Sequence, residues 1–305
     1  MRNSKTAEKT AVGVIGLGSM GFGVAASLLK AGFQVHAYDV RREALDRFET
    51  VGGIAAASPA ALGAEVQAVI ILVVNAAQTD AVLFGENGAA AAMRKGAVVI
   101  SSSTVAPEYA KQLGIRLHAM GLHNIDAPVS GGAAKAAIGQ LSVMGSGSPA
   151  AFDQCQPVFD AIAAKLYRLG GEPGKGSTVK MINQLLAGVH IAASAEAMAL
   201  GIKAGADPAA LYEVISNSAG SSWMFQNRVP HILAGDYTPL SAVNIFIKDL
   251  GIVLDSARKE SFPLPLTATA HQMFLAAAAA GYGAEDDSAV VKIFPGIDLP
   301  NTDKA

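Results

Sequence analysis

The residues before position 40 constrain the fold more than any other part of the chain. The apolar run Ala11 to Ile15 leads into Gly16-Leu17-Gly18-Ser19-Met20-Gly21, and a helix-like segment, Phe22 to Lys30, follows. In a strand, glycine turn and helix of this kind, the first glycine permits a tight turn and the second lets the backbone approach a pyrophosphate. The third lets helix and strand pack closely. The pattern predicts a Rossmann-type sheet that binds a dinucleotide through residues 16–21.

The next predicted strand, Gln34 to Tyr38, ends at Asp39 and strengthens this interpretation, since a glycine pattern alone is weak evidence. A carboxylate at this position can accept hydrogen bonds from the adenosine ribose hydroxyls, and it repels the additional phosphate of NADP. We therefore expect NAD as the cofactor, with NADP as the less favoured alternative. Arg41 and Arg42 could bind such a phosphate, although arginines that open a solvated helix would have the same pattern.

Apolar runs alternate with helix-like segments as far as residue 172, which is typical of an α/β, doubly wound sheet with some antiparallel pairing at its far end. The runs lie at 68–74, 97–101, 122–126, 140–144 and 165–169. After Pro173 the strand patterns stop, and a long apolar-periodic segment at 178–204 begins a series of helices.

This change of pattern predicts two domains. We expect an N-terminal tail at 1–10, an NAD-binding Rossmann domain at 11–173, an all-helical substrate and oligomerisation domain at 174–298, and a C-terminal tail at 299–305. A long interdomain helix would join the two domains.

Composition narrows the class of protein. The chain has 305 residues and a net charge of −2, and it lacks a basic stripe interleaved with aromatics, so nucleic acid is not an expected partner. Its apolar runs are interrupted before ~18 residues, which argues against a membrane span. The first ten residues lack an apolar segment, which argues against a signal peptide. The lone Cys155 excludes an internal disulfide framework and fits a reducing cytoplasm.

Two short segments follow predicted strands, at the edge where open parallel sheets bind ligands. Val73, Val74 and Asn75 end the run at 68–74 and could line the cofactor crevice, although Asn75 is equally consistent with a simple turn residue. Thr104 follows the run at 97–101. It could contact the nicotinamide end of the cofactor, or it could cap the helix that begins near residue 107.

The segment Asp126-Ala127-Pro128-Val129-Ser130-Gly131-Gly132 has the composition of an anion site. Consecutive glycines let several backbone N–H groups converge on one carboxylate, and the Ser130 hydroxyl can assist them. The alternative is a glycine turn without a ligand. We expect Ser130, Gly131 and Gly132 to bind the carboxylate of a substrate.

Proton transfer is the role suggested by the segment Gly174 to Asn183. Lys180 and Asn183 are three residues apart, so a helix places their side chains on one face. When a hydride leaves a C–H(OH) centre, a base within hydrogen-bond reach can take the hydroxyl proton, and the same group can return it in the reverse reaction. The six histidines have no paired ligand spacing, and no metal is expected.

Four motifs together resemble those of the β-hydroxyacid dehydrogenases, the relatives of 3-hydroxyisobutyrate dehydrogenase. They are the glycine turn at 16–21, the segment 126–132, the segment 174–183 and Lys248-Asp249-Leu250, and they extend over nearly the whole chain. The resemblance implies that Lys180 is the catalytic lysine and that Asn183 orients the substrate. It also implies that Lys248 lies near the cofactor, whereas the residues alone suggest a solvated helix charge.

The resemblance further implies roles for Ser130, Gly131 and Gly132 in substrate binding and for Thr104 in cofactor binding. It predicts an NAD-dependent oxidoreductase for a small hydroxyacid, assembled as a homodimer or homotetramer. Residues 185–192 and 220–225 are similar to the branch of the family that oxidises L-threonate, a four-carbon sugar acid, at C2.

Other functions stay open at this point. 3-Hydroxyisobutyrate, or glycerate as in tartronate semialdehyde reductase, is an alternative substrate, and a non-catalytic NAD-binding sensor or interaction protein is an alternative of a different class. Trp223, Phe225, Asn227 and Arg228 could line the far end of a substrate pocket, or they could pack within the helical domain.

Overall fold

The computed structural model describes residues 10–300, and it divides into two units, Met1–Lys180 and Met181–Ala305. Each unit is described by itself. The sequence pattern placed the boundary between residues 173 and 174, within the segment that leads into the long helix. Most of the two predicted tails lies outside the described residues.

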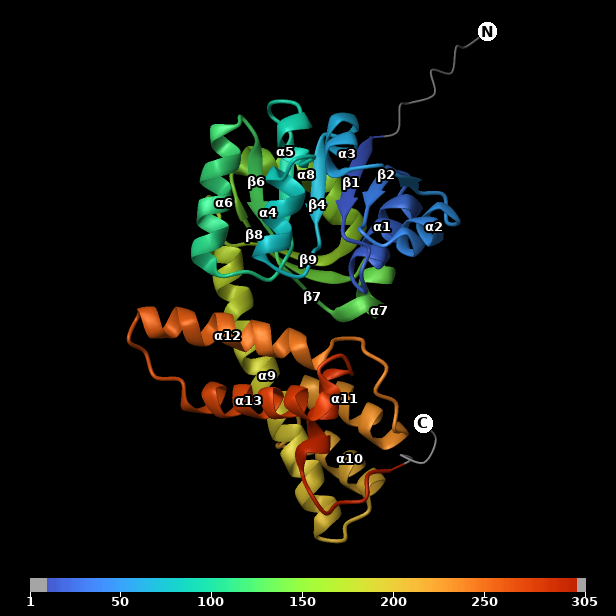
Figure 1. Ribbon diagram of the computed structural model, residues 1–305, viewed down its shortest axis with the longest axis vertical. Helices are drawn as coiled ribbons and strands as arrows, with labels where there is room; N and C mark the ends of the chain where they lie inside the picture. The colour runs from blue at the N-terminus through green and yellow to red at the C-terminus, as the bar shows by residue number, and fades with distance from the viewer. Residues whose placement is uncertain (1–9, 301–305) are drawn as a thin grey trace. The chain divides into compact units, whose positions relative to one another are not determined.

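A nine-stranded sheet forms the centre of the first unit, in the order β3-β2-β1-β4-β5-β6-β8-β7, with β9 paired to β8 (Figure 1). Strands β1 to β6 are parallel neighbours, whereas β8 runs antiparallel to β6 and β7. The doubly wound fold is therefore confirmed, and so is antiparallel pairing at the far end. The strands are β1 (Ala11–Ile15), β2 (Gln34–Tyr38), β3 (Ile54–Ala55), β4 (Ala68–Ile71), β5 (Val98–Ser101), β6 (His123–Asp126), β7 (Val129–Ser130), β8 (Leu141–Gly147) and β9 (Ala163–Arg168).

Helices cover both faces of this sheet, and the strands show why. Along β4, Ala68 and Ile70 enter one hydrophobic core while Val69 and Ile71 enter the other, because successive side chains of a strand point to opposite faces. The helices are α1 (Gly21–Lys30), α2 (Arg42–Glu49), α3 (Pro59–Glu65), α4 (Ala76–Phe84), α5 (Ala89–Ala92), α6 (Pro107–Ala119), α7 (Gly132–Ala137) and α8 (Pro149–Ile162). Cys155 of α8 packs within the first core, where burial raises the pKa of its thiol to about 12.

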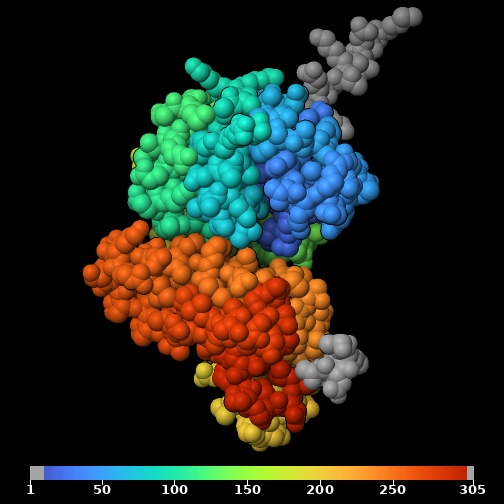
Figure 2. Space-filling view, in the orientation of Figure 1, coloured from blue at the N-terminus to red at the C-terminus, as the bar shows by residue number. Residues whose placement is uncertain are grey.

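The second unit is helical, as the sequence predicts. Helix α9 (Lys175–Lys203) has 29 residues and stops before Gly205, whose φ of +84° suits glycine. It is followed by α10 (Pro208–Ser216), α11 (Trp223–Ala234), α12 (Val243–Lys259), α13 (Pro265–Ala277), the π turn Ala278–Tyr282 and the 3-10 helix Asp287–Ile293. Helices α12 and α13 form an antiparallel pair, and their side chains make one continuous surface, drawn orange in Figure 2.

The core of this unit explains the apolar composition of α9. By length and composition α9 could cross a membrane, with a mean hydropathy of 1.6 over an 18-residue window. The sequence pattern did not predict this, because polar residues and glycines interrupt each apolar run of α9 although the average over 18 residues is apolar. Ile191 and Ala195 of α9, however, pack in one core with Phe246 and Phe274, whose rings stack 5.2 Å apart. The apolar positions on this face of α9 therefore have a core to fill.

A buried ion pair joins α11 to the 3-10 helix. Arg228 donates to both carboxylate oxygens of Asp287, from Nε at 2.5 Å and from a terminal nitrogen at 3.1 Å, and both residues are buried. Burial raises the pKa of Asp287 to about 6, and the guanidinium of Arg228 opposes that rise. The ion pair therefore links two elements of the second unit.

We expect Arg228→Met to lower the free energy of unfolding by about 3–5 kcal/mol, because it leaves a buried carboxylate without its cation. The folded-state pKa of Asp287 exceeds the unfolded value of about 3.9, so this group favours folding below that pH and loses its contribution as the pH rises through about 6. Arg228 stabilises the ionised form of Asp287. The loss of unfolding free energy in Arg228→Met should therefore be larger at pH 8, above this pKa, than at pH 5. Urea unfolding measures it, with the exposed Arg258→Ala as the control; equal losses in the two variants would contradict the prediction.

Candidate active site

The glycine turn lies at the C-terminal end of β1, and its three glycines have different surroundings. Gly16 has a φ of +96°, and a Cβ there would lie 2.8 Å from the carbonyl oxygen of Leu72. A Cβ on Gly21 would lie 1.8 Å from the carbonyl oxygen of Gly16. Around Gly18, by contrast, no described residue other than Gly18 and its two chain neighbours has an atom within 4 Å of a Cβ. Gly16 and Gly21 are thus needed by the protein's own packing, whereas Gly18 leaves room for a ligand.

Asp39 faces this turn from the end of β2. Its carboxylate accepts a hydrogen bond from the backbone N–H of Leu17 at 2.7 Å and from Nε of Arg41 at 3.1 Å. Burial tends to raise the pKa of Asp39, but hydrogen bonds from Arg41 and Leu17 outweigh it and hold the pKa below its ordinary value. Asp39 is therefore ionised and available as an acceptor for ribose hydroxyls. Arg41 is thus more than a solvated arginine that opens a helix, because it bonds to Asp39 beside the turn. Arg42, by contrast, pairs with Asp46 on the surface of α2.

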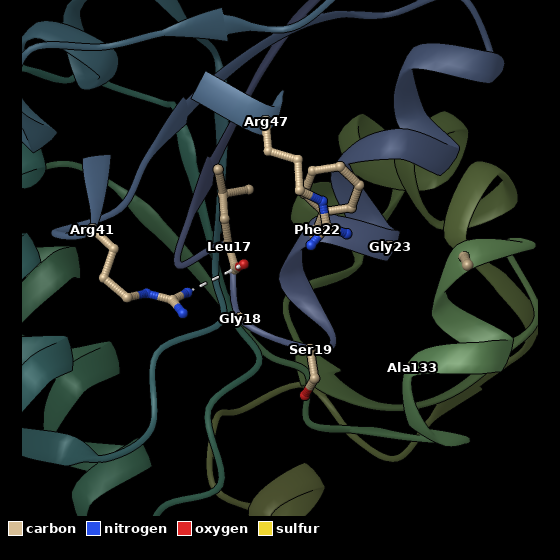
Figure 3. A pocket seen from close by; sticks show the side chains of 9 residues that line it. Leu17, Gly18, Ser19, Phe22, Gly23, Arg41, Arg47 and Ala133 are labelled. Carbon is tan, nitrogen blue, oxygen red and sulfur yellow. Dashed lines mark hydrogen bonds between the residues drawn. The ribbon is translucent and has the colours of Figure 1, made fainter. Parts of the chain in front are cut away.

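A pocket of about 290 Å³ opens beside the turn, and Figure 3 shows its lining. Arg41 reaches toward the carbonyl oxygen of Leu17, and the guanidinium of Arg47 lies 3.8 Å from the centre of the Phe22 ring. Two cations beside the start of α1 suit an anionic group, because the N–H groups at a helix N-terminus attract negative charge. The residues present fit the phosphate part of a dinucleotide. The lining residues are Leu17, Gly18, Ser19, Phe22, Gly23, Arg41, Arg47, Ala133 and Ala137.

Backbone hydrogen bonds align the other strand ends with β1. Leu72 N–H donates to Ile15 at 2.8 Å, and Ser102 N–H donates to Ile71 at 2.9 Å. The segments after β4 and β5 therefore start at the same edge of the sheet as the glycine turn. This is the edge at which the sequence predicts cofactor contacts from Val73, Val74, Asn75 and Thr104.

The segments after β4 and β5 lead into helices α4 and α6, whose N-caps are Asn75 and Ala106. The Asn75 side chain caps α4 by accepting from Gln78 N–H at 2.9 Å, and Val74 N–H donates to the Gln78 side chain. The cap occupies the side-chain oxygen of Asn75, so a cofactor contact from this side chain would use its NH₂ group. The N-cap of α6 is Ala106, so Thr104 does not occupy the N-cap position of that helix.

The segment 130–132 forms a short strand and a turn. Ser130 pairs with Ser142 of β8, and the sequence pattern did not identify this strand, β7. Gly131 and Gly132 have φ values of +135° and +72°, which other residues rarely adopt. The glycines are thus required by the backbone. Whether the turn binds a carboxylate stays a prediction.

Lys180 and Asn183 lie one helical turn apart on α9. Lys180 is 8% exposed and belongs to the first unit, whereas Asn183 is half-buried and belongs to the second. The lysine is thus a buried polar group on the first turns of α9, and its role in proton transfer stays a prediction.

Asn183 belongs to a chain of hydrogen bonds that ends at Lys248. Lys248 Nζ donates to one oxygen of Asp249 at 2.5 Å, and Gln184 Nε2 donates to the other at 2.6 Å. An ionised carboxylate only accepts, so Gln184 must present its NH₂ group to it and its oxygen to Asn183, which donates at 3.0 Å. The Asn183 oxygen is left for another partner. The sequence interpretation assigned no role to Gln184, which directly follows the motif at 174–183, or to Asp249, which lies within the motif Lys248-Asp249-Leu250.

Three of the four aromatic and polar residues of α11 that could line a substrate pocket make contacts within the second unit. Phe225 is buried and stacks with Tyr212 at 6.0 Å between ring centres, and Arg228 pairs with Asp287. Asn227 accepts a hydrogen bond from Arg228. Trp223, by contrast, is 57% exposed. Packing accounts for Phe225 and Arg228 without a ligand.

Comparison with known proteins places this geometry in a family. A family model described as the NAD binding domain of 6-phosphogluconate dehydrogenase matches residues 11–171. A second, described as NAD-binding of NADP-dependent 3-hydroxyisobutyrate dehydrogenase, matches residues 174–294. The chain belongs to the β-hydroxyacid dehydrogenase family. Members of this family are hydroxyacid oxidoreductases with a Rossmann unit and a helical unit. Here the motif at 16–21 lies in the Rossmann unit, and the motif at 174–183 spans the boundary between the two units.

Relatives of this β-hydroxyacid dehydrogenase are similar over nearly their full length. An L-threonate dehydrogenase of Cupriavidus necator is 65% identical, over 95% of this chain and 97% of the relative. One of Escherichia coli K12 is 52% identical, over 97% and 98%. A crystal structure described as 3-hydroxyisobutyrate dehydrogenase from Salmonella typhimurium is 52% identical with a TM-score of 0.90, over 94% of this chain and 100% of that one.

Proposed function

We propose that this enzyme oxidises L-threonate at C2 to the corresponding 2-oxo acid, with NAD as the cofactor. The observation that carries the proposal is the buried Lys180, which stands one helical turn before Asn183 in a chain 65% identical to an L-threonate dehydrogenase. Asp39 supports NAD, because its ionised carboxylate faces the glycine turn where the ribose hydroxyls would bind.

Each residue has a stated task in this reaction. When bound, NAD supplies the acceptor for the hydride that leaves C2. Lys180 Nζ takes the hydroxyl proton as the C2–H bond breaks, so the carbon–oxygen bond of the product becomes double. The amide oxygen of Asn183, left open by its bond to Gln184, orients the substrate. Ser130 Oγ and the N–H groups of Gly131 and Gly132 bind the substrate carboxylate.

A substrate panel tests the proposal. L-threonate, 3-hydroxyisobutyrate and glycerate are each incubated with NAD and, separately, with NADP, while the absorbance of the reduced nicotinamide is followed. We expect kcat/KM for L-threonate to exceed that for the other acids by about tenfold or more. NAD should be preferred to NADP because of the Asp39 charge. A clear preference for 3-hydroxyisobutyrate would replace L-threonate as the substrate, and NAD binding without turnover would favour the non-catalytic alternative.

The proposal includes a homodimer or homotetramer in the cytoplasm. Support for assembly comes from α9, where Val179, Ile182 and Leu186 are exposed at spacings of three and four residues and so form one row. An apolar row of this kind is typical of a surface that a second subunit covers. Light scattering of the purified protein would measure the mass, and a monomer at micromolar concentration would contradict this part.

A further inference from the structure

Asp126, at the end of β6, is bonded to the start of α9. The carboxylate is 1% exposed. One oxygen accepts from the N–H groups of Gly174 at 2.9 Å and Ser177 at 2.8 Å, and the other accepts from Ser177 Oγ at 2.6 Å. Ser146 Oγ of β8 donates to the carboxylate at 3.3 Å and itself accepts from Gly176 N–H at 3.0 Å. Two strands thus bind the first turn of α9.

This arrangement replaces a local helix cap with a distant one. The first N–H groups of a helix lack partners inside it, and most helices satisfy them with a neighbouring Ser, Thr, Asp or Asn. Here the acceptor lies 51 residues before Ser177. A negative charge at a helix N-terminus is also favourable. The cap consequently joins α9 to the sheet rather than merely ending the helix.

The fit between helix and sheet is close at Gly176. A Cβ there would lie 2.3 Å from the carbonyl oxygen of Met144 and 2.7 Å from that of Asp126. Burying a carboxylate is costly unless hydrogen bonds compensate for lost water. Burial does raise the pKa of Asp126, against the opposing effect of Ser177, Gly174 and Ser146. The buried carboxylate of Asp126 carries a cost that an exposed cap avoids, and it binds a helix turn that has no room for a side chain at Gly176. This cost implies a function beyond ending the helix.

Lys180 lies three residues after Ser177, on the next turn of α9, and the boundary between the two units falls just after it. We propose that Asp126 is a positioning residue for Lys180: it fixes the first turn of α9 to the sheet, so the lysine keeps a set place in the unit that carries the cofactor motif. This inference rests on the proposed function of Lys180. It makes Asp126 part of the proton-transfer geometry without contact with the substrate.

Four variants test the proposal in the full-length enzyme. Asp126→Ala removes the acceptor, Ser177→Ala removes only the hydroxyl bond, and Asp126→Asn keeps an oxygen that can accept from the two N–H groups. Ser27→Ala is the matched control, because it removes a buried hydrogen bond, to the Ala136 carbonyl, elsewhere in the same unit. Each variant is assayed for kcat and KM with L-threonate, for NAD affinity, for melting temperature and for hydrogen exchange of the amides at 174–180.

In Asp126→Ala, exchange at 174–180 should accelerate and kcat should fall about 10- to 100-fold, as displaced catalytic groups do, with NAD affinity within about twofold of wild type. Ser177→Ala should show a smaller loss in the same direction. Asp126→Asn should recover most of kcat, and Ser27→Ala should keep all of it. Loss of NAD affinity and kcat together would overturn the proposal, as would unchanged kcat in Asp126→Ala. Lys180→Ala, assayed in parallel, separates the two hypotheses: if it keeps full activity, the proposed function of the lysine fails, whereas unchanged exchange in Asp126→Ala refutes the anchor itself.

Discussion

Lys180→Ala should lower kcat for the preferred hydroxyacid by about a thousandfold, because general acid–base groups contribute roughly 10²–10⁴ to the rate. The side chain belongs to the turn that follows the bonded start of α9, and it is buried. Its loss should leave NAD affinity unchanged, since the glycine turn and Asp39 hold the cofactor independently of α9. Initial rates and titration with NAD measure the two effects separately.

Two other lysine variants make the result specific. Lys180→Met retains most of the buried stem without the amine, so it should lose as much activity as Lys180→Ala while disturbing the packing less. Lys175→Ala removes an exposed lysine from the same helix and should keep wild-type kcat. Wild-type turnover in Lys180→Met would require another group to take the proton, and the assignment of Lys180 would have to be abandoned.

Sequence reasoning succeeded where one local pattern has one structural meaning. The glycine turn predicted the type of sheet. Asp39 follows β2, as expected, and bonds to the turn, whereas its contact with the ribose stays a prediction. The apolar run Ala11 to Ile15 gave β1 its bounds, since a strand with two buried faces ends where its apolar run ends. The predicted bounds of β2 also match the structure.

The remaining features depend on contacts between distant residues. Asp126 was grouped with the anion segment because it lies close to Ser130 and the glycines in sequence. Its carboxylate, however, accepts hydrogen bonds from Gly174 and Ser177, which lie 48 and 51 positions later. The orientation of Asn183 depends on Asp249, which lies 65 residues beyond its intermediate partner Gln184. No periodicity links such positions. Strand β7 was missed for a related reason, as two residues give no alternation to detect.

The glycine turn yields the second large effect, in Gly21→Ala. Alanine is favoured over glycine inside a helix by about 1 kcal/mol, and Gly21 is the first residue of α1. A Cβ there would nevertheless lie 1.8 Å from the Gly16 carbonyl oxygen, and a backbone atom cannot turn aside as a flexible side chain can. The clash therefore outweighs the helix preference. We expect unfolding stability to fall by about 1–3 kcal/mol or more, with loss of measurable NAD binding.

Gly18→Ala provides the matched comparison three residues away. Apart from Gly18 and its two chain neighbours, no described residue lies within 4 Å of a Cβ on Gly18, so the variant should unfold like the wild type. It should still weaken NAD binding by more than about tenfold, because the second glycine of the turn is the one that lets the backbone approach the pyrophosphate. Chemical denaturation and calorimetric titration measure the two properties in both variants. If Gly18→Ala bound NAD normally, the cofactor would not pass over this turn; if Gly21→Ala were fully stable, the close contact between α1 and the β1 turn would not be needed for folding.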